Sequence, residues 1–176
     1  MKALTVWQPW ASLIIAGAKP YEFRGWRCPR SLIGQRIVIH AAARKIDPVE
    51  PLGLWNTLAE RDYDEEGRIF AAETCLHPEL AMPILERACP PSLFPGRDPL
   101  PIGAGIGTAV LGEPRNGLEI AEEFGVPRAN DSARGEHANW GWPMLDIEQW
   151  SQPIPMRGKQ GFWNWPDASD LGGLPA

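Results

Sequence analysis

Three charged side chains near the amino terminus have the types and the spacing to bind a polar ligand. Lys19, Glu22 and Arg24 stand within six residues of one another. An ammonium and a guanidinium group neutralise a phosphate or a polarised carbonyl, and a carboxylate accepts hydrogen bonds from an exocyclic amino group of a base. In an extended strand, Glu22 and Arg24 share one face about 7 Å apart, and Lys19 reaches the same side. The pattern predicts three converging charges; the alternative is an exposed row of ion pairs that contributes about 0–1 kcal/mol to stability.

The flanking segments predict how these charges are held. Apolar side chains recur at helical spacing over residues 10–17, and Gly17 is typical of a helix end. Pro20 disfavours a helical conformation at Lys19, so the chain must pass directly from the helix into a strand over residues 20–26. Lys19 is therefore expected at the mouth of that strand.

The rest of the chain predicts a mostly-β protein of the α+β class. Its 18 Gly and 19 Pro residues exceed ordinary usage and predict many turns. Strand patterns occupy residues 2–7, 20–26, 36–42, 102–111, 140–150 and 160–165; helical patterns occupy 47–60, 78–87 and 119–124; and a proline-rich loop is expected at 88–101. Several short strands with few long helices are typical of a small β-barrel with peripheral helices.

Charge is distributed unevenly along the chain. The formal net charge of −5 excludes a protein that coats DNA non-specifically. Residues 1–50 nevertheless carry eight Lys and Arg against three Asp and Glu, a net of +5, whereas residues 51–176 carry nine against nineteen, a net of −10. An anionic partner should therefore approach the amino-terminal part.

Several other classes of protein are not expected. The three cysteines, Cys28, Cys75 and Cys89, form no disulfide framework, and their spacing with His77 matches no standard zinc site, so neither a metal nor another cofactor is predicted. Signal-peptide and membrane-spanning patterns are absent from the sequence, which predicts a cytoplasmic protein without a membrane partner.

The charged segment resembles a known signature. Gly17, Lys19, Glu22 and Arg24 match the pattern G-x-K-x-x-E-x-R of ASCH domains, which belong to the PUA-like superfamily of small β-barrels. The resemblance extends to residues 3–14, 39–42, 105–110 and 153–163. It implies one ASCH domain of the PUA-like type over residues 1–165, with an insertion at about 47–101 and a flexible tail at 166–176.

The resemblance implies that a cleft at these charges binds RNA or a modified nucleoside. Lys19 and Arg24 would bind its anionic part, Glu22 would recognise or activate it, and Trp10 or Trp26 would stack on a base. The other candidate binding residues are His40, Arg157 and Lys159. Replacing Lys19 or Glu22 by alanine is expected to abolish binding and to leave the melting transition nearly unchanged.

Two other functions remain open at this point. Some members of the superfamily are amidohydrolases that deacetylate 4-acetylcytidine with a Lys, a Thr nucleophile and a Glu, but Glu22 stands where those enzymes have the Thr. Their mechanism therefore does not transfer, although Lys19 and Glu22 as catalytic residues could direct water at an acylated nucleoside or, as a ribonuclease, at single-stranded RNA. A third hypothesis makes the acidic insertion at 47–101 a surface for a protein partner.

Overall fold

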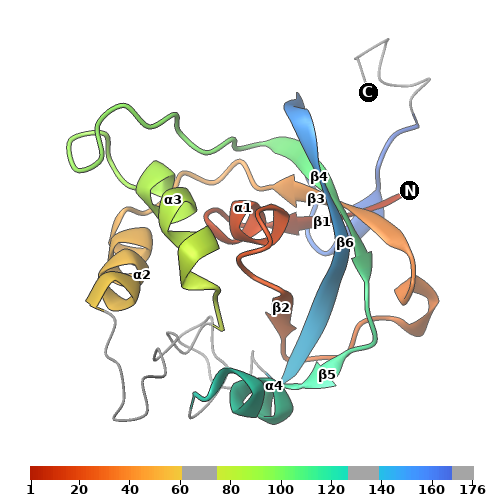
Figure 1. Cartoon of the computed structure of the whole chain (residues 1–176). Helices are drawn as coiled ribbons and strands as arrows, with labels where there is room; N and C mark the ends of the chain where they lie inside the picture. The colour runs from red at the N-terminus through yellow and green to blue at the C-terminus, as the bar shows by residue number, and fades with distance from the viewer. Residues whose placement is uncertain (61–74, 127–138, 168–176) are drawn as a thin grey trace.

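A single curled sheet forms the framework of the protein (Figure 1). The structure, a computed structural model, describes residues 1–60, 75–126 and 139–167. The strands of this part are β1 (Lys2–Val6), β2 (Tyr21–Arg24), β3 (Arg36–Ala41), β4 (Ala104–Leu111), β5 (Arg115–Asn116), β6 (Trp140–Pro155) and β7 (Phe162–Asn164). They form one seven-stranded sheet in the order β2-β6-β4-β3-β1-β7, with β5 paired to β6. The sheet curls into a half-barrel, so the expected mostly-β, barrel-like fold is confirmed.

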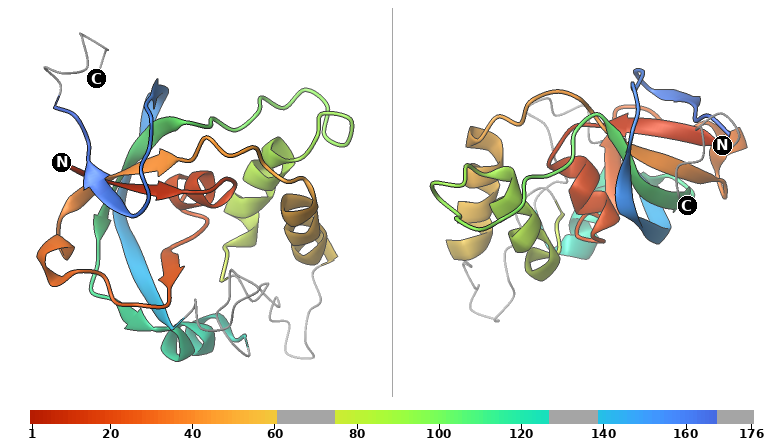
Figure 2. Two further views of the ribbon diagram at one scale, coloured as in Figure 1. Left: turned by 180° about the vertical axis from the view of Figure 1, so that it is seen from behind. Right: turned by 90° about the horizontal axis from the view of Figure 1, so that it is seen from above.

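The concave side of the half-barrel holds the main core. Helix α1 (Trp10–Ile15) lies against this side in both views of Figure 2. Strands β1 and β3 run parallel beside each other, and their alternate side chains point inward to meet the helix. The apolar side chains of this core include Leu4, Val6, Leu13, Ile14, Ile37, Ile39, Trp142 and Met144. The strand–helix–strand arrangement predicted for the first 26 residues is thus present.

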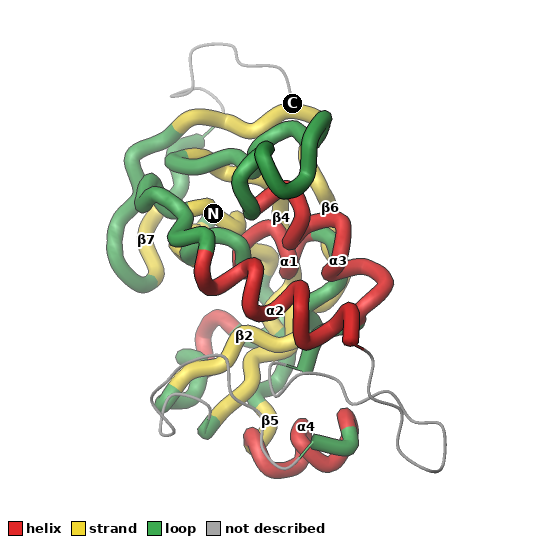
Figure 3. The backbone as a smooth tube through the Cα atoms, turned by 90° about the vertical axis from the view of Figure 1, so that its left-hand side faces the viewer, coloured by secondary structure: helices red, strands yellow, loops and turns green. Residues whose placement is uncertain are grey.

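Around the sheet lie three further helices of the described residues. Helices α2 (Val49–Glu60) and α3 (Pro78–Ala88) pack side by side beyond α1, and Figure 3 looks onto this side. Helix α4 (Gly117–Phe124) follows β5 and covers the end of the sheet near β2. A short 3-10 turn, η1 (Arg30–Leu32), lies in the connection from β2 to β3. The helical patterns at 47–60, 78–87 and 119–124 are confirmed by these positions.

A second apolar cluster covers the convex side of the sheet. It contains the buried side chains of Ala3, Val38, Trp163 and Trp165, and Trp150 packs against them. The indoles lie directly on the β4 backbone, because a Cβ atom at Gly105 would lie 2.5 Å from Trp165. Three of the nine tryptophans therefore serve packing on this outer face.

Strand β6 is longer than the sequence predicts. The pattern suggested a strand over 140–150 that ends before Pro153, whereas β6 continues to Pro155. Beyond Pro143 its only described partner strand is β4, and proline is tolerated where the other side of a strand is unpaired.

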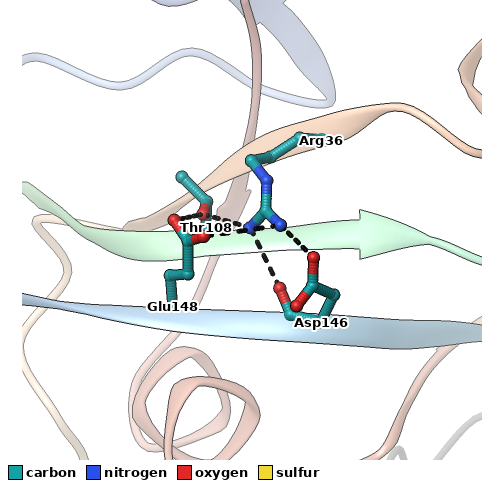
Figure 4. A network of polar contacts seen from close by, with 4 residues as sticks. All are labelled: Arg36, Thr108, Asp146 and Glu148. Carbon is teal, nitrogen blue, oxygen red and sulfur yellow. Dashed lines mark hydrogen bonds and ion pairs between the residues drawn. The ribbon is translucent and has the colours of Figure 1, made fainter.

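The Arg36 side chain on β3 binds side chains of β4 and of an irregular part of β6 (Figure 4). Its Nη1 donates to Thr108 Oγ1 at 2.8 Å and to the Asp146 carbonyl at 2.9 Å, and its Nη2 pairs with the Asp146 carboxylate and lies 3.6 Å from Glu148 Oε1. Asp146 has a φ of 44°, and the register between β4 and β6 shifts beside it. The contacts of Arg36 are therefore structural ones that hold the bulge.

Two expectations remain, on the carboxyl-terminal tail and on membrane-spanning helices. Apart from residues 166 and 167, the predicted tail at 166–176 lies outside the described residues. Within the described part of the chain, no helix has the length and apolar character that crossing a membrane requires.

Candidate functional site

The turn from α1 into β2 places Lys19 inside the protein. Gly17 ends the helix with a φ of +73°, a conformation in which most other residues are strained. The Lys19 amide then donates to the Leu13 carbonyl at 3.0 Å, and the Pro20 carbonyl accepts from Met144 on β6 at 2.8 Å. The side chain between these anchors is thereby aimed into the concave side.

The Lys19 ammonium group is completely buried. Its side chain is 0% exposed, and Nζ donates to the Tyr21 carbonyl at 2.7 Å and lies 3.7 Å from Glu22 Oε2. The rings of Phe23 and Trp10 lie 4.7 and 5.4 Å from Nζ. A buried charge is stable only where it is paired and hydrogen-bonded, so Lys19 requires this setting.

Glu22 connects Lys19 to Arg24. Glu22 is 4% exposed and pairs in register with Trp142 on β6, and its Oε1 lies 2.7 Å from Arg24 Nη2. The Arg24 side chain is 35% exposed, and its guanidinium lies 5.9 Å from the Trp142 ring. The three charges thus form a row from the interior to the surface with a net charge of +1, as the spacing predicted.

Arg24 has hydrogen-bonding capacity left over. Its Nε is buried and has no hydrogen-bond partner among the described residues. A buried donor without an acceptor is costly. The Arg24 side chain as a whole is 35% exposed, so a ligand oxygen would meet the exposed part of the guanidinium.

The opposite face of β2 is fixed by α4. The Tyr21 hydroxyl donates to the Glu123 carboxylate at 3.1 Å and accepts from Arg115 Nη1 at 2.7 Å, and Arg115 also pairs with Glu123. Burial, followed by the neighbouring Glu123 carboxylate, raises the pKa of Tyr21. These contacts hold the strand that carries Glu22 and Arg24.

The two predicted stacking residues have different surroundings. Trp10 is buried, with Nε1 3.3 Å from Glu50 Oε1 on α2, and its ring covers Lys19. Trp26 is 51% exposed, and its ring centroid lies 4.8 Å from that of Trp142 in an edge-to-face arrangement. Trp26 therefore offers a ring surface to a ligand, whereas Trp10 is part of the packing around the ammonium group.

Long-range pairing adds residues that the sequence alone did not single out. Trp142 donates from Nε1 to the Trp26 carbonyl at 3.1 Å and stacks on Phe162 at 5.6 Å between centroids. The Arg27 guanidinium lies 4.0 Å from the Trp140 ring. The sequence offered one signal for Trp140 and Trp142, their alternation in a strand pattern. Their partners Trp26 and Arg27 are more than 100 positions away in sequence.

His40, by contrast, belongs to the outer face. It is buried, its Nε2 lies 2.9 Å from the Met156 carbonyl, and its Nδ1 lies 3.4 Å from Thr5 Oγ1. Because a carbonyl only accepts, Nε2 carries the hydrogen and donates it. Trp163 Nε1 donates to the same Thr5 hydroxyl at 3.0 Å.

Arg157 and Lys159 are exposed in the loop between β6 and β7. The residue between them, Gly158, lies on the His40 ring, because a Cβ atom there would be 2.4 Å from His40 Cε1. The structure thus groups these two cations with His40 on the outer face, and not with Lys19 on the concave side.

The described residues offer little for metal or thiol chemistry. Within residues 1–60, 75–126 and 139–167, no cluster of three His, Cys, Asp or Glu side chains could hold a metal ion. Burial, followed by the Glu113 carboxylate, raises the pKa of Cys28 to about 11, and burial also raises the pKa of Cys89. These two thiols are therefore protonated and weakly nucleophilic at neutral pH.

Comparisons with known proteins identify the family. The model of the ASCH domain matches residues 4–93, which include α1, β2 and the row of charges. Among solved structures, the chain is similar to a tyrosine-to-phenylalanine mutant of the ASCH protein ZmASCH from Zymomonas mobilis, with 14% sequence identity, a TM-score of 0.44, and coverage of 96% of this chain and 91% of that chain. No curated protein matches the chain. Since the matched segment spans half of the sequence, the chain belongs to the ASCH domain family.

Proposed function

We propose that this ASCH domain binds RNA or a modified nucleoside at the outer end of the Lys19–Glu22–Arg24 row. ASCH domains are generally associated with nucleic acid, which is the class of ligand that this proposal specifies. The observation that carries it is the juxtaposition of a partly exposed guanidinium, with its Nε unpartnered among the described residues, and an exposed indole two positions away at Trp26.

Each side chain has a distinct task in this proposal. Arg24 donates to a phosphate or carbonyl oxygen of the ligand, and Trp26 stacks on the base, a contact worth about 1–3 kcal/mol. Glu22 fixes the guanidinium through the 2.7 Å ion pair. Lys19 lies too deep for direct contact in this conformation and compensates the Glu22 charge. The sequence alone had given Lys19 a direct role in binding the anion.

Calorimetric titration of the four common nucleosides, their 5′-monophosphates and 4-acetylcytidine tests this proposal. Arg24→Gln and Trp26→Ala are suitable variants because both side chains are partly exposed, and each should weaken binding by about tenfold or more. Leu93→Ala is the control, since Leu93 is 51% exposed, as Trp26 is, but lies after α3. Failure of every compound to bind, or equal affinity of all three variants, would refute the proposal.

Hydrolysis is the second candidate, and the same samples test it. The position of Glu22 between two cations suits a group that orients water next to a polarised carbonyl or phosphate. Formation of cytidine and acetate from 4-acetylcytidine, or shortening of an RNA oligomer, would assign catalysis in addition to binding. Binding without product would leave the binding function alone.

A further inference from the structure

A second aromatic and basic group lies at the carboxyl ends of the parallel strands β1 and β3. Trp7 directly follows β1 and is 58% exposed, and the Arg44 guanidinium lies 4.1 Å from its ring centroid. Arg44 and Lys45 are both exposed in the segment that leaves β3. The nearest described acid in sequence, Asp47, accepts from the Val49 amide at 3.1 Å at the start of α2.

The loop with Arg157 and Lys159 reaches the same end of the sheet. Its Gly158 lies against His40 and Thr5, which are partners in the β1–β3 register. Its Met156 amide donates to the Gly103 carbonyl at 2.9 Å, and Gly103 in turn lies against Ala43, next to Arg44. The hydrogen bond from His40 Nε2 to the Met156 carbonyl holds the loop against β3.

From these contacts we infer that one surface at this end of the sheet binds the phosphate chain of single-stranded RNA. We name it the outer basic surface, and it consists of Trp7, Arg44, Arg157 and Lys159. It goes beyond the proposed nucleoside site, because its residues follow β1, β3 and β6, whereas Arg24 lies on β2 and Trp26 follows that strand. Exposed cations around an accessible indole match alternating phosphates and bases. The +5 charge of residues 1–50 favours the same partner.

The binding of a dodecamer of uridylate, measured by fluorescence anisotropy over a range of salt concentrations, tests this surface. The Arg44→Gln/Lys159→Gln variant should bind the dodecamer roughly tenfold more weakly at low salt, and the slope of log affinity against log salt should become less negative by about 1.4, since each lost phosphate contact on a single strand changes it by about 0.7. Lys2→Gln is the matched control: Lys2 is an exposed cation at the opposite end of β1.

A third variant separates charge from position. Gly158→Ala keeps every cation but forces the loop away from His40, so it should also weaken dodecamer binding if the loop must be held in place. Its melting temperature establishes that it is folded before it is titrated.

The inference is overturned if the dodecamer fails to bind the wild-type protein, or if the double variant binds it with the affinity and slope of Lys2→Gln. Its failure is distinguishable from failure of the nucleoside site. The double variant should retain wild-type affinity for a mononucleotide, whereas Arg24→Gln should lose that affinity and keep most of the salt slope.

Discussion

Lys19 and Glu22 are ionisable side chains held where water does not reach, and each compensates the charge of the other. Arg24 extends the same row to the surface, so a ligand meets the guanidinium first. The row therefore combines a buried structural pair with one exposed recognition group. This division follows from burial, which the alternating sequence pattern did not reveal.

The burial of Lys19 revises the expected effect of replacing Glu22. Glu22→Ala removes the carboxylate that lies 3.7 Å from the buried ammonium, so we predict that the free energy of unfolding falls by about 3–5 kcal/mol. Lys19→Met/Glu22→Leu removes both charges and should recover most of this loss. Urea unfolding of the two variants measures the difference; a single variant within about 1 kcal/mol of wild type would show that the pair is not effectively buried.

Arg24 should not be replaceable by lysine. Arg24→Lys keeps the positive charge beside Glu22 but removes the Nε–H donor and the planar fork. We predict near wild-type stability together with about tenfold weaker binding of the nucleoside identified in the titrations. Thermal melting and calorimetry give the two quantities, and unchanged affinity would mean that Arg24 acts only through its charge.

At the scale of elements, local signals predicted the strand–helix–strand unit and its turn. Gly17 and Pro20 determine the path of the chain by their own backbone preferences, so the position of Lys19 could be expected. The length of β6 could not be predicted, because that length depends on the pairing of the strand with β4. His40 lies on the face of β3 opposite Ile37, as strand alternation requires, but its loop partners come from residues 156–158 and could not be predicted.

The close contact of β4 and β6 makes one glycine irreplaceable. A Cβ atom at Gly107 would lie 2.4 Å from the Glu148 carbonyl oxygen, so Gly107→Ala should destabilise the fold by about 1–3 kcal/mol or more. Gly53→Ala in α2, where an added Cβ atom would meet no described side chain or other segment within 4 Å, should be neutral or stabilising by up to about 1 kcal/mol. Denaturant unfolding compares the two, and equal effects would contradict the packing of β4 on β6.

Cys28, in the segment between β2 and β3, should make the free energy of unfolding depend on pH above neutrality. Because the folded-state pKa of Cys28 is raised from 9.0 to about 11, the unfolded chain loses this proton first. The contribution of the protonated Cys28 thiol to the free energy of unfolding is complete below pH 9 and is lost as the pH rises toward 11. Urea unfolding across this range should show the decline in wild type and a shallower one in Cys28→Ala; identical slopes would contradict the burial of the thiol.

At the scale of the whole molecule, the sheet has two chemically different sides. Its concave side holds the Lys19–Glu22–Arg24 row, and the convex side holds the tryptophan cluster and the loop over His40. The sequence predicted that cations and tryptophans would gather near the amino terminus. It could not predict which side each would occupy, because residues such as Trp142 and Trp163 come from distant strands.

Photo-crosslinking with 4-thiouridine monophosphate identifies the side chain that stacks on the base. We expect an adduct on Trp26, found by mass spectrometry of the digested protein and lost in Arg24→Gln. An adduct confined to Trp7, or adducts unaffected by Arg24→Gln, would contradict the proposed nucleoside site.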